Sequence, residues 1–172
     1  MKRAVVVLLA IATLGSVAYL IALPPHAEEH AAIFVTQIAP GYRDWRLISV
    51  SHEAGNLNSL GAVLGNDVAI KAYREGKLPF PDGTIIAALH YTHTSSEEND
   101  KVFGRAQSFV PEKPTNIQFM VKDSNKYAAT RGWGFAHFTP DGKPGDAALM
   151  KTCFPCHEKA ILTDLVFTHY AP

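Results

Sequence analysis

Apolar and polar residues alternate along several short runs of the chain, which is the pattern of β-strands that bury one face. Glycine, proline, asparagine and aspartate gather between these runs, where they favour tight turns. Because the connections are short, we expect neighbouring strands to pair antiparallel in one sheet. The expected strands cover residues 45–52, 59–64, 84–94, 102–110, 117–121 and 133–139, with a polar, acidic loop at 95–101.

One stretch between the strands carries clear helix signals. Asn66 is a favourable N-cap, Asp67 meets the positive end of the helix dipole, and Gly76 is a typical C-terminal stop. These residues predict a helix over 67–75, and a second short helix is expected within 124–130. The sequence therefore predicts an α+β fold, mainly an antiparallel β-sheet with a few packed helices.

The strand expected at 133–139 has an uneven division of side chains between its faces. Over residues 132–137, alternation places Trp133, Phe135 and His137 on one face and Gly132, Gly134 and Ala136 on the other. Such a small-residue face has room for a flat group to approach closely. It equally suits a neighbouring helix or a bulge, and the sequence alone leaves both interpretations open.

The N-terminal stretch has the features of a secretory signal. Lys2 and Arg3 precede a long apolar run without acidic residues, and small residues at Ala18 and Ala27 offer cleavage sites. The apolar run is almost long enough to cross a bilayer, so an uncleaved anchor is the alternative. We expect a signal peptide or anchor at 1–27, an N-terminal lead at 28–41 and one folded domain at 42–172.

Composition limits the classes of function. The chain has 172 residues, which suits one compact domain with a short extension. Without residues 1–27, acidic side chains outnumber basic ones by two, and no basic cluster indicates a nucleic-acid partner.

One motif near the C-terminus indicates a specific chemistry. Cys153 and Cys156 are three positions apart and His157 follows directly, which is the C-x-x-C-H pattern of c-type haem attachment. In this interpretation the two thiols form thioethers to one covalent haem c, and His157 is the proximal ligand of its iron. Haem attachment of this kind takes place outside the cytoplasm, so the motif agrees with the predicted signal peptide. Single basic residues such as Arg46 or Lys122 would neutralise the haem propionates.

The cysteine pair has three other possible interpretations. A structural zinc site needs further ligands, and His137, His157 and His169 fit no familiar finger spacing. A thioredoxin-like dithiol would need a βαβ context, which the strand pattern does not offer. A simple disulfide is the third interpretation.

Several motifs occur in the order found in a known family. The chain resembles cytochrome P-460 and the related cytochromes c′-β from about Tyr42 to Tyr170. The resembling segments are residues 44–52, 65–69, 81–84, 132–135 and 153–157. The resemblance implies a periplasmic, largely antiparallel β-protein, often a homodimer, with a five-coordinate haem iron. Members of the P-460 branch oxidise hydroxylamine and react with nitric oxide.

The resemblance also implies roles for residues outside the haem motif. In the P-460 branch a lysine side chain is bonded to the porphyrin, and Lys71 is the first candidate for that position, with Lys77 second. Catalytic members carry a carboxylate over the distal side of the haem, at a position that corresponds to the region of Ala136, where this chain offers neither Asp nor Glu. His137 is the candidate for proton transfer there. We otherwise expect an apolar distal pocket lined by phenylalanines such as Phe80, Phe109 or Phe135.

Two functions follow from these expectations. The leading one is a periplasmic haem protein that oxidises hydroxylamine or nitric oxide and passes electrons to an acceptor cytochrome. The alternative is a non-enzymatic cytochrome that binds nitric oxide or another gas, or that transfers electrons. Electron transfer would favour a second axial ligand, for which Met120 and Met150 are available.

Overall fold

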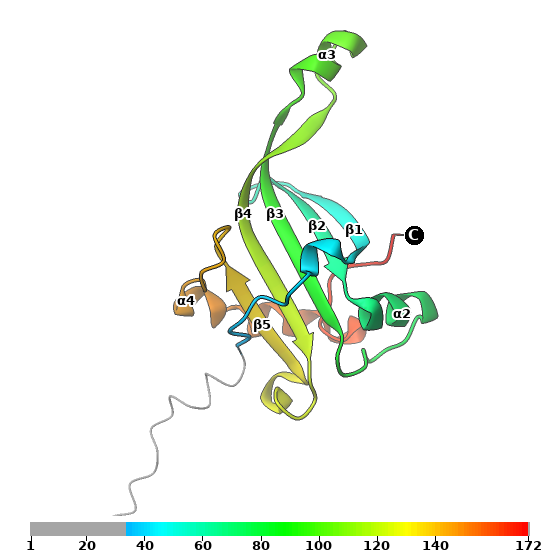
Figure 1. Cartoon of the computed structure of the whole chain (residues 1–172), viewed down its shortest axis with the longest axis vertical. Coiled ribbons are helices and arrows are strands. Elements are labelled where there is room, and N and C mark those ends of the chain that lie inside the picture. Colours follow the sequence, from blue (N-terminus) through cyan, green and yellow to red (C-terminus); the bar gives the residue numbers. More distant parts are fainter. Residues whose placement is uncertain (1–33, 172) are drawn as a thin grey trace, which may run out of the picture.

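The computed structural model describes residues 34–171, which are built on a five-stranded antiparallel sheet (Figure 1). The strands lie in chain order, so each one pairs with the next. This meander confirms the predicted α+β fold with an antiparallel sheet. The strands are β1 (Arg46–Glu53), β2 (Ser59–Gly65), β3 (Ile85–Ser95), β4 (Phe109–Lys122) and β5 (Trp133–Phe138).

Short helices connect and follow the strands. The longest, α2 (Asp67–Glu75), has the bounds that the sequence predicts. The Asn66 side chain accepts a hydrogen bond from the Ala69 amide at 3.0 Å, and Gly76 ends the helix with a φ of 59°. The others are η1 (Tyr42–Asp44), α3 (Glu97–Phe103), η2 (Ala128–Thr130), α4 (Ala147–Met150), α5 (Cys153–His157) and η3 (Glu158–Thr163).

The segment between β3 and β4 differs from the sequence-based expectation. The predicted loop at 95–101 and the first part of the predicted strand at 102–110 are wrong, because α3 occupies 97–103. Ser96 caps this helix, acidic residues stabilise its first turn, and Gly104 ends it at a φ of 71°. Figure 1 shows that α3 and the adjoining ends of β3 and β4 extend well beyond the other strands.

The two faces of the sheet are covered by different parts of the chain (Figure 1). On the first face, Ile86, Met120 and Phe135 form a core with α2 and with the C-terminal segment that follows α5. On the second face, Phe119 and its neighbours pack against residues 35–45. The Cys-x-x-Cys-His motif therefore lies over the first face.

The packing around β5 explains the small residues of this strand. Trp133 and Phe135 face the first core, as alternation predicts. On the other side, a Cβ atom added to Gly134 would overlap the ring of Tyr127, which is 2% exposed. The small residue therefore accommodates a tyrosine, and the space that the sequence offered to a flat group is already filled.

The predicted signal peptide or anchor at 1–27 lies outside the described residues. Among residues 34–171, no helix is both long and apolar enough to span a bilayer.

Candidate functional site

Helix α5 carries both cysteines of the motif and places Cys153 beside the first core. Cys153 is half-buried and packs against that core, whereas Cys156 is exposed, and both are free thiols. Burial raises the pKa of the Cys153 thiol, and the neighbouring Cys156 adds to the effect. Residues three positions apart share one side of a helix, so both sulfur atoms can reach one bound group.

The imidazole of His157 is held in one orientation. Its ring lies between Phe135 and Phe167, with centroid distances of 5.1 and 4.9 Å. Its Nδ1 is 2.8 Å from the carbonyl oxygen of Leu165. A carbonyl oxygen can only accept a hydrogen bond, so Nδ1 carries the proton and Nε2 has the free lone pair. Burial lowers the pKa of His157, partly offset by this hydrogen bond, which favours the neutral form that binds metals.

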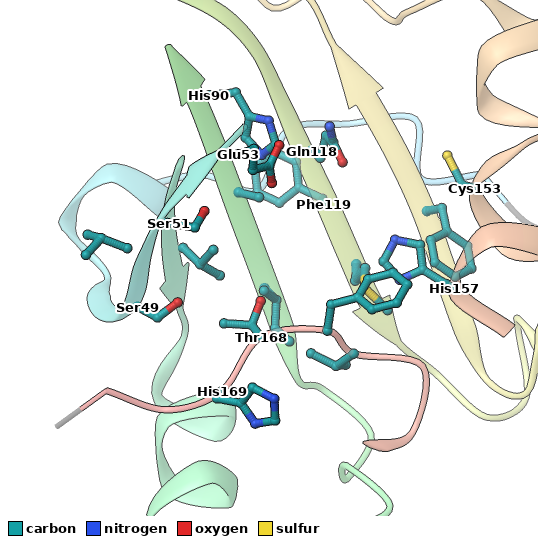
Figure 2. A pocket seen from close by; sticks show the side chains of 18 of the residues that line it. Ser49, Ser51, Glu53, His90, Gln118, Phe119, Cys153, His157, Thr168 and His169 are labelled. Carbon is teal, nitrogen blue, oxygen red and sulfur yellow. The ribbon is translucent and has the colours of Figure 1, made fainter. Parts of the chain in front are cut away.

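A cavity of about 540 Å³ lies between the first face of the sheet and the C-terminal segment (Figure 2). Cys153 and His157 line one side of it. Apolar side chains of the sheet, Val63, Ile86 and Met120, form part of its floor. This volume is within the range of small-molecule and cofactor sites, about 300–1,000 Å³.

The opposite wall of the cavity is polar. Figure 2 shows Ser51, Glu53, His90 and Gln118 across the cavity from His157. Gly61 lies among them, and a Cβ atom there would come within 2.7 Å of the Ser51 hydroxyl oxygen and 4.0 Å of Nε2 of His90. The glycine therefore leaves both polar groups open to the cavity.

The structure favours haem among the interpretations of the cysteine pair. Among the described residues, no group of three or more His, Cys, Asp or Glu side chains could hold a metal ion, which removes the zinc site. Every strand pairs antiparallel, so the motif has no βαβ context for a thioredoxin-like dithiol. Two thiols, an oriented imidazole and an adjacent cavity are the set that a covalent haem requires.

A family model for cytochrome P460 matches residues 39–168. The chain belongs to the cytochrome P460 family. The match spans the whole sheet and α5, and it identifies the chain as a haem protein. No curated protein matches the sequence.

In this cytochrome P460 family member, the two candidate lysines lie outside the main cavity. The Lys71 side chain is 74% exposed on α2, and its Nζ is 4.0 Å from the carboxylate of Glu75. Lys77 lines a smaller cavity of about 210 Å³ on the α2 side of the C-terminal segment. No lysine of the described residues lines the main cavity. Neither position supports the expected haem cross-link, which stays untested.

His137 faces the same side of the sheet as the cavity without lining it. Gly145 packs against its ring so closely that an added Cβ would clash. Its Nδ1 is buried without a hydrogen-bond partner among the described residues. Burial and then the nearby His90 lower the pKa of His137. Its role in proton transfer remains a prediction.

The residues expected around the distal side are only partly brought together. Phe135 lines the cavity, Phe80 lies in the core beside α2, and Phe109 is 57% exposed near α3. Ala136 is among the residues that line the cavity although its side chain packs in the core of the second face, and Glu53 of β1 is the carboxylate that lines the cavity. Of the three phenylalanines named as examples, only Phe135 lines the cavity, together with Phe119 and Phe167.

Sequence reasoning missed the polar wall. Alternation along the strand expected at 84–94 already places His90 on the same face as Ile86 and Ala88, which was a usable signal. Glu53 had no such signal, since it lies just beyond the strand expected at 45–52. The two expected partners of the haem propionates are also engaged elsewhere, Arg46 with Asp67 at 2.6 Å and Lys122 with Asp164 at 2.9 Å.

Proposed function

We propose that this cytochrome P460 family member carries one haem c, bound through thioethers to Cys153 and Cys156, with His157 as the proximal ligand. We further propose that it oxidises hydroxylamine or nitric oxide at an iron position that is open toward the cavity. The observation that carries this function is the arrangement across the cavity. An imidazole with a free Nε2 lies on one side, and a carboxylate and a second imidazole lie on the other.

The polar wall suits a substrate that must lose protons. Hydroxylamine releases protons as electrons are removed from it, so a base beside the bound substrate lowers the barrier. Glu53 is the carboxylate that lines the cavity, and among residues 34–171 its side chain accepts one long hydrogen bond, at 3.4 Å from the Ser59 hydroxyl. We assign Glu53 the role of general base, with His90 as the neighbouring proton carrier. A haem bound there would supply the electron acceptor and the ligand site.

Replacing Glu53 with glutamine tests this assignment. The amide keeps the shape and cannot take a proton, so we expect hydroxylamine oxidation to slow about 100-fold. Nitric oxide binding, which needs no base, should remain within a factor of about two because the cavity keeps its shape. Steady-state oxidation and ligand titration measure the two effects.

Glu98→Gln is the matched control, because Glu98 is an exposed carboxylate on α3, far from the cavity. This variant should oxidise hydroxylamine at the wild-type rate. An unchanged rate in Glu53→Gln would refute the general-base role.

Gas binding without turnover is the second candidate function. The apolar floor of the cavity favours it, because Val63, Ile86 and Met120 suit a small uncharged ligand. Wild-type protein that binds nitric oxide but does not oxidise hydroxylamine would establish this function.

Met120 lines the cavity and Met150 does not, so only Met120 remains as an expected second axial ligand for electron transfer.

We propose that the haem is attached through the cysteines alone. The expected lysine cross-link would require an amine against the porphyrin edge, whereas the lining of the main cavity has no lysine. The absorption spectra of Lys71→Ala and Lys77→Ala should therefore equal that of the wild type, with an ordinary high-spin c-type Soret band. A red-shifted wild-type band that either substitution abolishes would show that the cross-link exists.

The cellular setting of this function is also a proposal. The charged and apolar pattern of residues 1–27 supports export to the periplasm, either as a cleaved signal or as an anchor. An acceptor cytochrome and a homodimer are supported only by the resemblance. Light scattering of the purified holoprotein measures the dimer, and N-terminal sequencing measures the cleavage.

A further inference from the structure

A buried ion pair joins the sheet to the turn that follows η3. Lys122, the last residue of β4, has a side chain that is 6% exposed, and that of Asp164 is 12% exposed. Nζ of Lys122 donates to both carboxylate oxygens of Asp164, at 2.9 and 3.0 Å, and to the Arg131 carbonyl at 3.1 Å. All the donors of this ammonium group are therefore satisfied, which is the condition for burying a charge.

The turn held by this pair has an unusual backbone. Asp164 and Leu165 have φ angles of 51° and 67°, in the left-handed region that a leucine seldom adopts. Such a conformation persists only when surrounding contacts over-determine it. Here the Asp164 carboxylate also accepts from the Phe80 amide at 2.9 Å, and the Leu165 amide donates to the Ala160 carbonyl at 2.9 Å.

The same turn presents the carbonyl that orients His157. The Leu165 carbonyl oxygen accepts from Nδ1 of His157 at 2.8 Å, and this carbonyl belongs to the peptide between Leu165 and Val166, one residue beyond Asp164. The direction of that carbonyl depends on the left-handed conformation at both residues. Lys122 is far from His157 in the sequence, yet it anchors the group that fixes the imidazole.

We propose that Lys122 and Asp164 are positioning residues for His157, which hold the Leu165 carbonyl against Nδ1 and so fix the tautomer and direction of the ring. The functional consequence of this inference rests on the proposed role of His157 as the haem ligand. A hydrogen bond from Nδ1 makes a ligating imidazole more electron-rich, so losing it should raise the reduction potential and weaken the iron–histidine bond.

The orientation of His157 can be measured first in the protein without haem. Nitrogen NMR of histidine-labelled protein should show the Nδ1–H tautomer of His157 in excess in the wild type. In Asp164→Ala the ratio of the Nδ1–H tautomer to the Nε2–H tautomer should fall about tenfold, as expected for the loss of one hydrogen bond. Asp164→Asn should reduce the ratio less than Asp164→Ala, since asparagine tolerates the left-handed conformation and its side-chain oxygen can still accept from the Phe80 amide or from Lys122.

Lys122→Met/Asp164→Asn removes both charges together and leaves no buried charge unpaired, so it guards against misfolding. The control is Lys143→Met/Asp141→Asn, which removes an exposed pair at 2.7 Å, distant from His157. In the holoprotein, Lys122→Met/Asp164→Asn should raise the reduction potential and lower the iron–histidine stretching frequency in the resonance Raman spectrum, whereas the control should change neither.

The positioning role is overturned if folded Asp164→Ala or Lys122→Met/Asp164→Asn keeps the wild-type tautomer ratio. It is equally overturned if the control shifts that ratio as much. The NMR result does not depend on haem, so it decides the positioning role even if the proposed ligation by His157 fails.

Discussion

Replacing His157 with alanine is expected to leave the haem covalently attached and to remove the proximal ligand from its iron. The cysteines that we propose to hold the porphyrin are untouched, whereas the imidazole between Phe135 and Phe167 is lost. The ferrous spectrum should lose its five-coordinate histidine features, and hydroxylamine oxidation should fall at least about 100-fold. Added imidazole should restore part of the spectrum by occupying the vacated space.

His169→Ala is the control for this prediction, since His169 also lines the cavity but comes from the C-terminal segment. We expect it to keep the proximal ligation. If His169→Ala removes the histidine features and His157→Ala does not, then the assignment of the two histidines is wrong.

Replacing Trp133 with alanine should have the largest effect on stability. The indole is fully buried, packs edge-on against Phe80 at 5.8 Å, and lies 4.9 Å from Nζ of Lys122. Removing a buried tryptophan side chain costs about 3–5 kcal/mol of unfolding free energy. Chemical denaturation of the wild type and the variant measures the difference.

Trp133→Phe separates the packing contribution from the polar one. The indole nitrogen is buried without a hydrogen-bond partner among the described residues, so phenylalanine removes an unsatisfied donor while it keeps most of the apolar contact. We expect this variant to lose less than half as much unfolding free energy as Trp133→Ala. Leu162→Ala, at a side chain that is 92% exposed, should change the unfolding free energy by less than about 0.5 kcal/mol. If Leu162→Ala lost as much unfolding free energy as Trp133→Ala, burial would not be the cause of the loss at Trp133.

Local signals carried most of the fold prediction. Helix α2 was predicted with its observed bounds because its cap, its first-turn charge and its terminal glycine all lie within the segment itself. The strands followed from alternation, and short turns gave their antiparallel order. Helix α3 was missed although Ser96 and Gly104 mark its ends, because the acidic residues between them suggested a loop.

The site was predictable only where its residues are adjacent in the chain. Cys153, Cys156 and His157 form one motif, so their common purpose was visible. Glu53 and His90 come from β1 and β3, on either side of β2, and the sequence does not reveal which face the C-terminal segment covers. The pairing of Lys122 with Asp164 likewise spans distant parts of the chain, and both residues look like ordinary surface charges in the sequence.

The intact mass of the protein, measured after denaturation, tests the central claim most directly. The chain should be produced in a host that attaches haem c outside the cytoplasm. We predict the mass of the mature polypeptide plus one haem, and the bare polypeptide mass for Cys153→Ala/Cys156→Ala. A wild-type protein that shows the bare polypeptide mass would contradict covalent attachment, and with it the function proposed for this cavity.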